Sequence, residues 1–148
     1  ALDLYNSPVN LFVASFIGSP AMNLMEGKIT GFSDRSVELE LSSGQKLSVA
    51  CSPGTSAVTG APVHFGVRPE HLDMTGHQDT TISGKVFAVE RLGGETYVYL
   101  SMEKGIEITL HAPGDMMVSE GDTISVGVDP EKCHLFTEQG TAFERLSS

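Results

Sequence analysis

The chain contains an internal repeat, and this repeat limits the possible folds more than any other feature. Residues 60–70 return as residues 121–131, with the glycines, the second valine, the proline and the glutamate in the same frame. A second pair of similar segments, residues 27–32 and 84–89, shares a Gly-Lys start. Duplicated segments of this kind indicate that one structural unit occurs twice. We therefore expect a folded body made from two copies of one β unit.

Alternating apolar and polar residues predict strands rather than helices after residue 22. Residues 36–41 alternate between aliphatic and polar side chains, and residues 47–49 resume the alternation after a Ser-Ser-Gly-Gln turn. This pattern is typical of a β-hairpin with one buried face. The other expected strands are residues 63–67, 85–90, 97–102, 106–110, 124–128 and 133–136. About ten short strands with frequent turns predict a closed or nearly closed β-barrel, or a sandwich.

The repeat also suggests a domain organisation. The two copies cover about residues 23–72 and 82–136. A copy of roughly 60 residues buries little surface by itself, so we expect one core shared by both copies, in a single domain over residues 23–148. Residues 1–22 are expected to form a linker with a short helix near residues 8–17, which begins at a Ser-Pro pair and ends at Gly-Ser-Pro.

Composition excludes several functions. The 148 residues carry 19 acidic and 9 basic side chains, a formal charge of −10, which disfavours binding to nucleic acid. A nucleic-acid-binding barrel needs exposed aromatics beside basic groups, whereas Tyr97 and Tyr99 share a strand face with Glu95.

The cysteine content indicates the cellular compartment. Two cysteines do not make a disulfide framework, so we expect the protein to lie in a reducing cytosol. Residues 1–20 lack the pattern of a signal peptide, and no apolar run approaches the length of a membrane helix.

Catalytic motifs are absent from the sequence. Residues 26–29 contain Gly-Lys but lack the first glycine and the hydroxyl residue of a phosphate-binding loop. The histidines have no zinc-ligand spacing, and adjacent strand residues such as Cys133 and His134 point to opposite faces. We therefore expect a core cysteine and a surface or strand-end histidine there. The chain is expected to have no catalytic residues, no cofactor and no metal.

Two segments offer candidate contacts for a partner. Arg68 and Glu70 flank Pro69 at a strand end, and only Arg68 has no counterpart in the second copy. The alternative interpretation is a local ion pair or turn that fixes the strand exit. Residues 90–96 form a charged hairpin tip, which is either a solvated turn or a contact with another subunit. The candidate residues of the two segments are Arg68, Glu70, Glu90, Gly93, Gly94 and Glu95.

Several long segments resemble one protein family. Residues 4–23, 66–72, 89–96, 130–136 and 140–142 are similar, in order, to the ATP-binding subunits of bacterial sugar ABC importers, including those for maltose and glycerol-3-phosphate. In that family these segments follow the ATPase domain. The resemblance implies an OB-type β-barrel with TOBE repeats that serves as a C-terminal regulatory domain. We expect the chain to be a piece of a longer protein, because it contains no Walker A, signature or Walker B motif.

The resemblance also implies partners. It predicts a homodimer of the subunit, permease subunits that dock on the missing ATPase domain, and a possible phosphotransferase IIA-type regulator. The parent would bind ATP and magnesium, and would lie in the cytoplasm at the inner face of the membrane. Gly121 and Gly127 match positions that the family associates with regulation, although tight backbone turns could equally require them. The alternative function is a TOBE module that binds a small oxyanion, which the charge of −10 disfavours.

Overall fold

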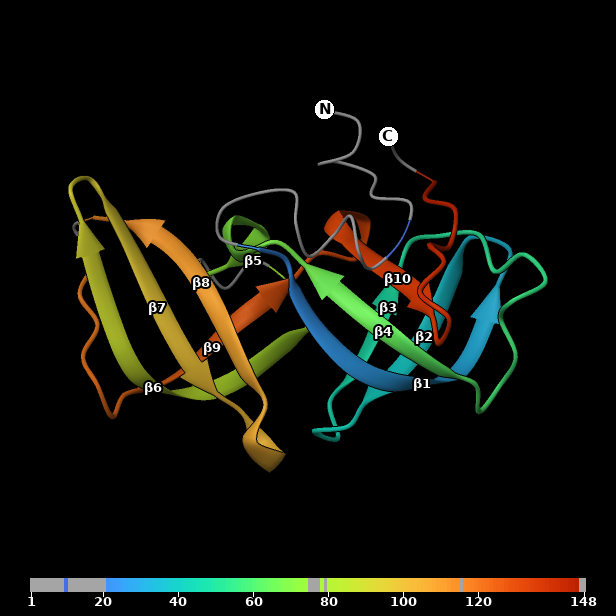
Figure 1. Ribbon diagram of the computed structural model, residues 1–148, viewed down its shortest axis with the longest axis horizontal. Coiled ribbons are helices and arrows are strands. Elements are labelled where there is room, and N and C mark those ends of the chain that lie inside the picture. Colours follow the sequence, from blue (N-terminus) through green and yellow to red (C-terminus); the bar gives the residue numbers. More distant parts are fainter. Residues whose placement is uncertain (1–9, 11–20, 75–77, 79, 115, 147–148) are drawn as a thin grey trace. The chain divides into compact units, whose positions relative to one another are not determined.

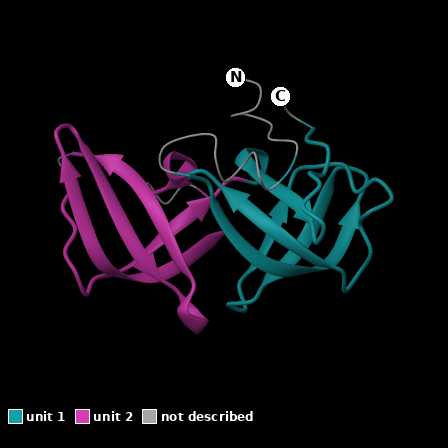
Figure 2. Ribbon diagram, viewed as in Figure 1, with its two compact units in different colours: residues 1–68, 130–148 teal, residues 69–129 magenta. Residues whose placement is uncertain are grey.

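Strands dominate the structure, which confirms the prediction of a mainly β protein. The computed structural model describes residue 10 and residues 21–74, 78, 80–114 and 116–146. The chain divides into two compact units, one comprising residues 1–68 and 130–148 and the other residues 69–129 (Figure 1, Figure 2). Each unit has its own antiparallel five-stranded sheet.

The first unit contains the sheet β10-β4-β1-β2-β3. Its strands are β1 (Asn23–Ser33), β2 (Ser36–Leu41), β3 (Lys46–Val49), β4 (Pro62–Val67) and β10 (Cys133–Thr137). The predicted hairpin is β2–β3. The short 3-10 helix η3 (Pro130–Lys132) lies against β3, where the Ala50 amide donates to the Pro130 carbonyl at 2.9 Å. This contact brings the two edges of the sheet together, so the unit is a nearly closed, OB-like barrel.

The second unit contains the sheet β5-β9-β6-β7-β8. Its strands are β5 (Leu72–Asp73), β6 (Thr81–Leu92), β7 (Glu95–Ser101), β8 (Glu107–Pro113) and β9 (Thr123–Val128). The 3-10 helix η1 (Pro69–His71) lies against β8, as η3 lies against β3 in the first unit. A third such turn, η2 (Glu103–Gly105), joins β7 to β8. Each repeated Pro-Glu segment therefore forms a 3-10 helix that lies against an edge strand of its unit.

The two copies exchange their last strands. After β4, the chain turns at Pro69 and adds β5 to the second sheet, where Leu72 pairs with Val128. After β9, the chain turns at Pro130 and adds β10 to the first sheet, where Cys133 pairs with Val67. The sequence analysis expected one core shared by residues 23–148. The structure groups the chain into two compact units, and each unit has a five-stranded sheet to which both repeats contribute strands.

Equivalent irregularities shape β1 and β6. The pairing of β1 with β2 shifts between Ile29 and Gly31, and the pairing of β6 with β7 shifts between Val86 and Ala88. A β-bulge bends its strand and increases the local twist, which lets one long strand curve around a barrel. The inward residue just before each shift is aliphatic and 1% exposed, Ile29 in β1 and Val86 in β6. Beyond the shift neither strand has a buried residue.

The helix expected near residues 8–17 lies outside the described residues, except for Asn10. Asn10 forms an isolated β-bridge with Thr141. The linker expected at residues 1–22 is therefore described only at residue 10 and residues 21–22. Among all described residues, no helix has the length and apolar character that crossing a bilayer requires.

Candidate interaction surface

The outward face of β6, β7 and β8 gathers aromatic and acidic side chains. Along β7, Thr96, Val98 and Leu100 point inward and are buried, so Tyr97 and Tyr99 lie on the opposite, outward face. The register aligns Glu90 of β6 with Tyr97, and Tyr97 with His111 of β8. Figure 1 shows these three strands side by side in the second unit. One row of the sheet thus joins a carboxylate, a phenol and an imidazole.

Direct contacts hold these side chains in place. The rings of Tyr97 and His111 are stacked, with centroids 5.0 Å apart and an interplanar angle of 20°. His111 Nε2 lies 3.2 Å from Glu95 Oε1, and the Tyr99 hydroxyl donates to Glu90 Oε1 at 3.2 Å. We call this surface the acidic aromatic face; its members are Glu70, Glu90, Glu95, Tyr97, Tyr99 and His111.

Three of the predicted contact residues affect the pKa of Tyr97. Burial raises the pKa of the Tyr97 phenol above its ordinary value, and the negative charges of Glu95, Glu70 and Glu90 raise it further. Glu70 reaches this surface because η1 lies against β8. Residues that the sequence analysis named in two separate segments therefore act on the same hydroxyl. The pKa of Tyr99 is also raised, by burial and by its hydrogen bond to Glu90.

The hairpin tip is fixed by an arginine that the sequence analysis did not single out. Gly93 has φ +62°, which glycine adopts readily in the turn between β6 and β7. Arg91 donates to Thr96 Oγ1 at 3.2 Å, to the Gly114 carbonyl at 3.0 Å and to the Met116 carbonyl at 2.8 Å. The Gly114 amide also donates to the Gly94 carbonyl at 3.0 Å. These bonds anchor the segment after β8 to the tip.

Arg68 lies in a different environment from the other candidates. It is 1% exposed, and burial lowers the pKa of its guanidinium. A side chain this buried offers little surface to a partner. The burial favours the structural interpretation that was weighed against a partner contact.

The repeated glycines have separate structural reasons. Gly121 has φ +94° and its counterpart Gly60 has φ +91°, a region that residues with a side chain rarely adopt. At Gly127 the backbone is not left-handed, but an added Cβ would lie 2.7 Å from Gln78 Cβ. Its counterpart Gly66 has no room either, since an added Cβ would lie 2.5 Å from Met22 Sδ. The turn explains Gly121, whereas close packing explains Gly127.

The expectation for the Cys133–His134 pair is half correct. Cys133 is a buried free thiol, as expected. His134 is also buried, at 4% exposed, so the surface alternative was wrong, whereas its place as the second residue of β10 agrees with a strand end. His134 is buried because its ring is stacked on that of Phe136, with centroids 6.5 Å apart, and Phe136 in turn packs with Met22. Within the described residues, no group of three His, Cys, Asp or Glu side chains could hold a metal ion.

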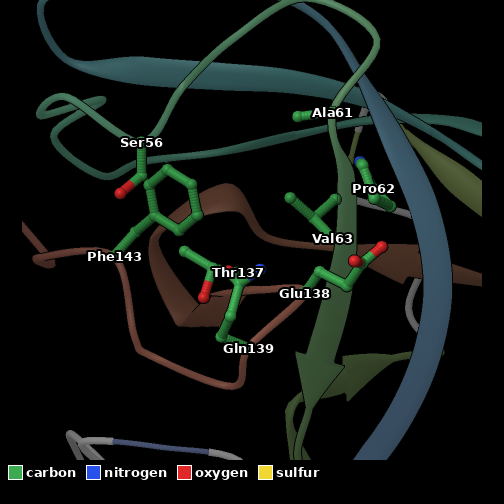
Figure 3. A pocket seen from close by; sticks show the side chains of 8 residues that line it. All are labelled: Ser56, Ala61, Pro62, Val63, Thr137, Glu138, Gln139 and Phe143. Carbon is green, nitrogen blue, oxygen red and sulfur yellow. The ribbon is translucent and has the colours of Figure 1, made fainter.

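The first unit has a small open pocket beside β4 and β10. Its volume is about 210 Å³, below the roughly 300 Å³ at which ligand pockets usually begin. Figure 3 shows its lining side chains, and none of the predicted contact residues is among them. They are Ser56, Ala61, Pro62, Val63, Thr137, Glu138, Gln139 and Phe143. The pocket is therefore a weaker candidate than the acidic aromatic face.

Two five-stranded antiparallel sheets and a duplicated Pro-Glu turn define the class of protein. The chain has the architecture of OB-type and TOBE domains, and the structural similarity agrees. A crystal structure of the cytoplasmic molybdate-binding protein ModG superposes with a TM-score of 0.66 at 19% identity, covering 76% of this chain and 94% of that one. At this identity the likeness shows the fold.

The sequence comparisons identify the family more closely. The MalK OB fold domain matches residues 18–72 and the TOBE domain matches residues 65–136. The maltose/maltodextrin import ATP-binding proteins MalK of Vibrio cholerae and Photorhabdus laumondii are both 40% identical over 146 residues, and that of Yersinia pestis is 39% identical. Each alignment covers 98% of this chain and, for the Vibrio cholerae and Yersinia pestis proteins, 39% of the relative. The chain belongs to the family of MalK-type C-terminal domains.

Proposed function

We propose that this chain is the regulatory and dimerisation domain of the ATP-hydrolysing subunit of a sugar ABC importer. The observation that supports this most is the 40% identity, over 98% of the chain, to proteins named maltose/maltodextrin import ATP-binding proteins. Because the chain spans 39% of the length of those relatives, the ATPase activity belongs to the remainder of the parent protein. ATP and magnesium would bind there, and the parent would lie in the cytoplasm at the inner face of the membrane.

The physical role of such a domain is to keep two ATPase domains close together. A pair of barrels that stays associated gives the ATPase domains a high effective concentration, so they can separate after hydrolysis without dissociating. Permease subunits would dock on the ATPase domains. A IIA-type regulator that contacts both this domain and an ATPase domain would favour one conformation through differential contacts.

The acidic aromatic face and the adjoining tip are the docking surface that we assign to a regulator. Glu70, Glu90 and Glu95 contribute charge, and the turn at Gly93 and Gly94 projects beyond the sheet. These residues lie on a sheet and on the turn that joins two of its strands. Binding residues commonly lie on loops that a rigid scaffold holds in position. Arg68, Gly121 and Gly127 would support this surface indirectly by maintaining the fold.

Light scattering of the 148-residue chain tests the dimerisation role. We expect the weight-average mass to rise from the monomer value of 15.7 kDa towards twice that value as concentration increases from about 1 to several hundred micromolar. A mass that stays at the monomer value over the whole range would contradict a dimerisation role for this domain. Regulator docking would then have to be tested in the full-length parent.

The second candidate function, oxyanion binding, has one observation in its favour. The structural neighbour ModG is described as a molybdate-binding protein, but the likeness at 19% identity supports the fold and not the ligand. The formal charge of −10 repels anions and therefore lowers their local concentration at this chain. A thermal-shift titration with molybdate separates the two functions. We expect no rise in Tm at micromolar molybdate, whereas a rise would favour the oxyanion function.

A further inference from the structure

The acidic aromatic face combines features that suit one kind of partner. Its carboxylates lie beside the half-buried rings of Tyr97 and Tyr99. Glu95 is 54% exposed at its side chain and His111 is 30% exposed. Phe87, which lies against Tyr99 with ring centroids 6.2 Å apart, is 43% exposed and extends the aromatic area. A rigid sheet thus presents ring faces and carboxylate oxygens together.

The face carries three carboxylates, and the neighbouring arginine directs its hydrogen bonds to neutral acceptors instead of to them. Arg91 donates to the carbonyls of Gly114 and Met116 and to Thr96, whose side chain is buried on the inward side of β7. The combined effect of Glu95, Glu70 and Glu90 is to oppose ionisation of Tyr97, which means that the three carboxylates add to one another at this place. The local field therefore attracts a cation.

We propose that the acidic aromatic face binds an arginine-bearing segment of a partner protein. This inference rests on the docking role given under the proposed function, and it specifies the chemistry of the docked partner. A guanidinium is planar and weakly hydrated, so it stacks on a tyrosine ring while its N–H groups pair with carboxylate oxygens. The arrangement of Tyr97 and Tyr99 beside Glu90 and Glu95 offers both contacts within one row of the sheet.

Charge argues against the other occupants of this face. A second copy of the chain would place acidic face against acidic face, with a formal charge of −10 on each copy, so homodimerisation would use a different surface. Nucleic acid and anionic lipid headgroups are repelled for the same reason. A cationic protein segment is the occupant that complements both the carboxylates and the rings.

A peptide titration monitored by NMR tests the proposal. The 15N-labelled 148-residue chain is titrated with capped Gly-Arg-Gly-Arg-Gly and with the same peptide carrying lysine in place of arginine. We expect the arginine peptide to shift the amide signals of β6, β7 and β8, with affinity that falls as salt is added. The lysine peptide should bind about 3-fold more weakly, because it cannot stack as a plane. Equal affinities, or shifts that map to other strands, would overturn the proposal.

Matched variants separate the face from the overall charge. The double variant Glu90→Gln/Glu95→Gln removes two carboxylates of the face, and Glu38→Gln/Glu40→Gln removes two exposed carboxylates from β2 of the first unit. We expect the first variant to weaken the arginine peptide about 5-fold and the second less than about 2-fold, because exposed pairs contribute modestly and locally. Equal weakening would show that only net charge matters and would overturn the proposal.

Two readouts keep the proposal separate from the proposed function. Light scattering of the same samples reports whether the chain still dimerises, and dispersed amide signals report that each variant is folded. Absence of peptide binding with dimerisation intact would refute the arginine-binding face and leave the dimerisation role standing. Binding of the arginine peptide by a strictly monomeric chain would support the face and contradict the dimerisation role.

Discussion

Replacement of Gly127 by alanine is the sharpest test of the structural argument. Gly127 lies on β9, next to Asp73 of β5, at the position where the first repeat joins the second sheet. A methyl group added there would lie 2.7 Å from Gln78 Cβ and 2.8 Å from Gln78 Cγ. Contacts this short require Gln78 to move. The resemblance associates this position with regulation, so the variant distinguishes a requirement of the fold from a contact with a partner.

The expected cost follows from two opposing effects. Overpacking of a well-packed site costs about 1–3 kcal/mol. Alanine reduces the freedom of the unfolded chain relative to glycine, which contributes about 0.4–1 kcal/mol of stability. The difference between the two effects is about 0–2.6 kcal/mol of lost stability. We expect Gly127→Ala to lose about 1 kcal/mol or more, because Gln78 Cβ is bonded directly to its backbone and cannot move away by itself.

The assay uses the distribution of aromatic residues. The chain has no tryptophan and three tyrosines, of which Tyr97 and Tyr99 lie on β7 in the same unit as Gly127. Urea unfolding followed by the near-ultraviolet circular dichroism of tyrosine therefore reports on that unit. A loss of about 1 kcal/mol lowers the urea midpoint by about 0.5 M.

The matched control is Gly94→Ala in the same unit. No heavy atom beyond its chain neighbours lies within 4 Å of an added Cβ at Gly94, and its backbone is not left-handed. The only remaining effect of Gly94→Ala is the lower conformational freedom of the unfolded chain. The urea midpoint of this variant should therefore equal or slightly exceed that of the unmodified chain. If Gly127→Ala unfolds at the same urea concentration as Gly94→Ala, the packing argument is refuted, and Gly127 must be retained for another reason.

Three further outcomes are expected. Replacement of Arg91 by glutamine removes the charged donor that anchors Met116, so the segment after β8 should become sensitive to limited proteolysis at a stability cost of about 1 kcal/mol; unchanged cleavage would contradict the anchoring role. Glu95→Gln should lower the pKa of Tyr97 in a spectrophotometric titration above pH 10, because one negative charge that opposes ionisation is removed, and a rise would refute the arrangement. Burial raises the pKa of the Cys51 thiol from 9.0 to about 11. Between pH 9 and pH 11 the thiol ionises in the unfolded chain but not in the folded one, so the free energy of unfolding should fall over this range. The same fall in Cys51→Ala would show that another group causes it.

Local patterns in the sequence were sufficient to predict most strands and turns. The hairpin β2–β3 and the strand β4 follow from alternation and from Pro69, because a strand with one buried face needs aliphatic side chains at every second position. Tyr97 and Tyr99 could be assigned to one face for the same reason. The contacts of Tyr97 with His111 and Glu70 could not, since they depend on which strands and turns become neighbours.

The sequence by itself determined the repeated β unit, its turns at Gly60 and Gly121, and the absence of ATPase motifs, because these depend on residues close together along the chain. Only the tertiary structure decided that each copy gives its last strand to the other sheet. Leu72 and Cys133 follow similar turns, and nothing local distinguishes the two sheet edges that they could join. That choice is made by the long-range hydrogen bonds and packing of complete sheets. The same long-range pairing assembles the acidic aromatic face from β6, β7, β8 and η1.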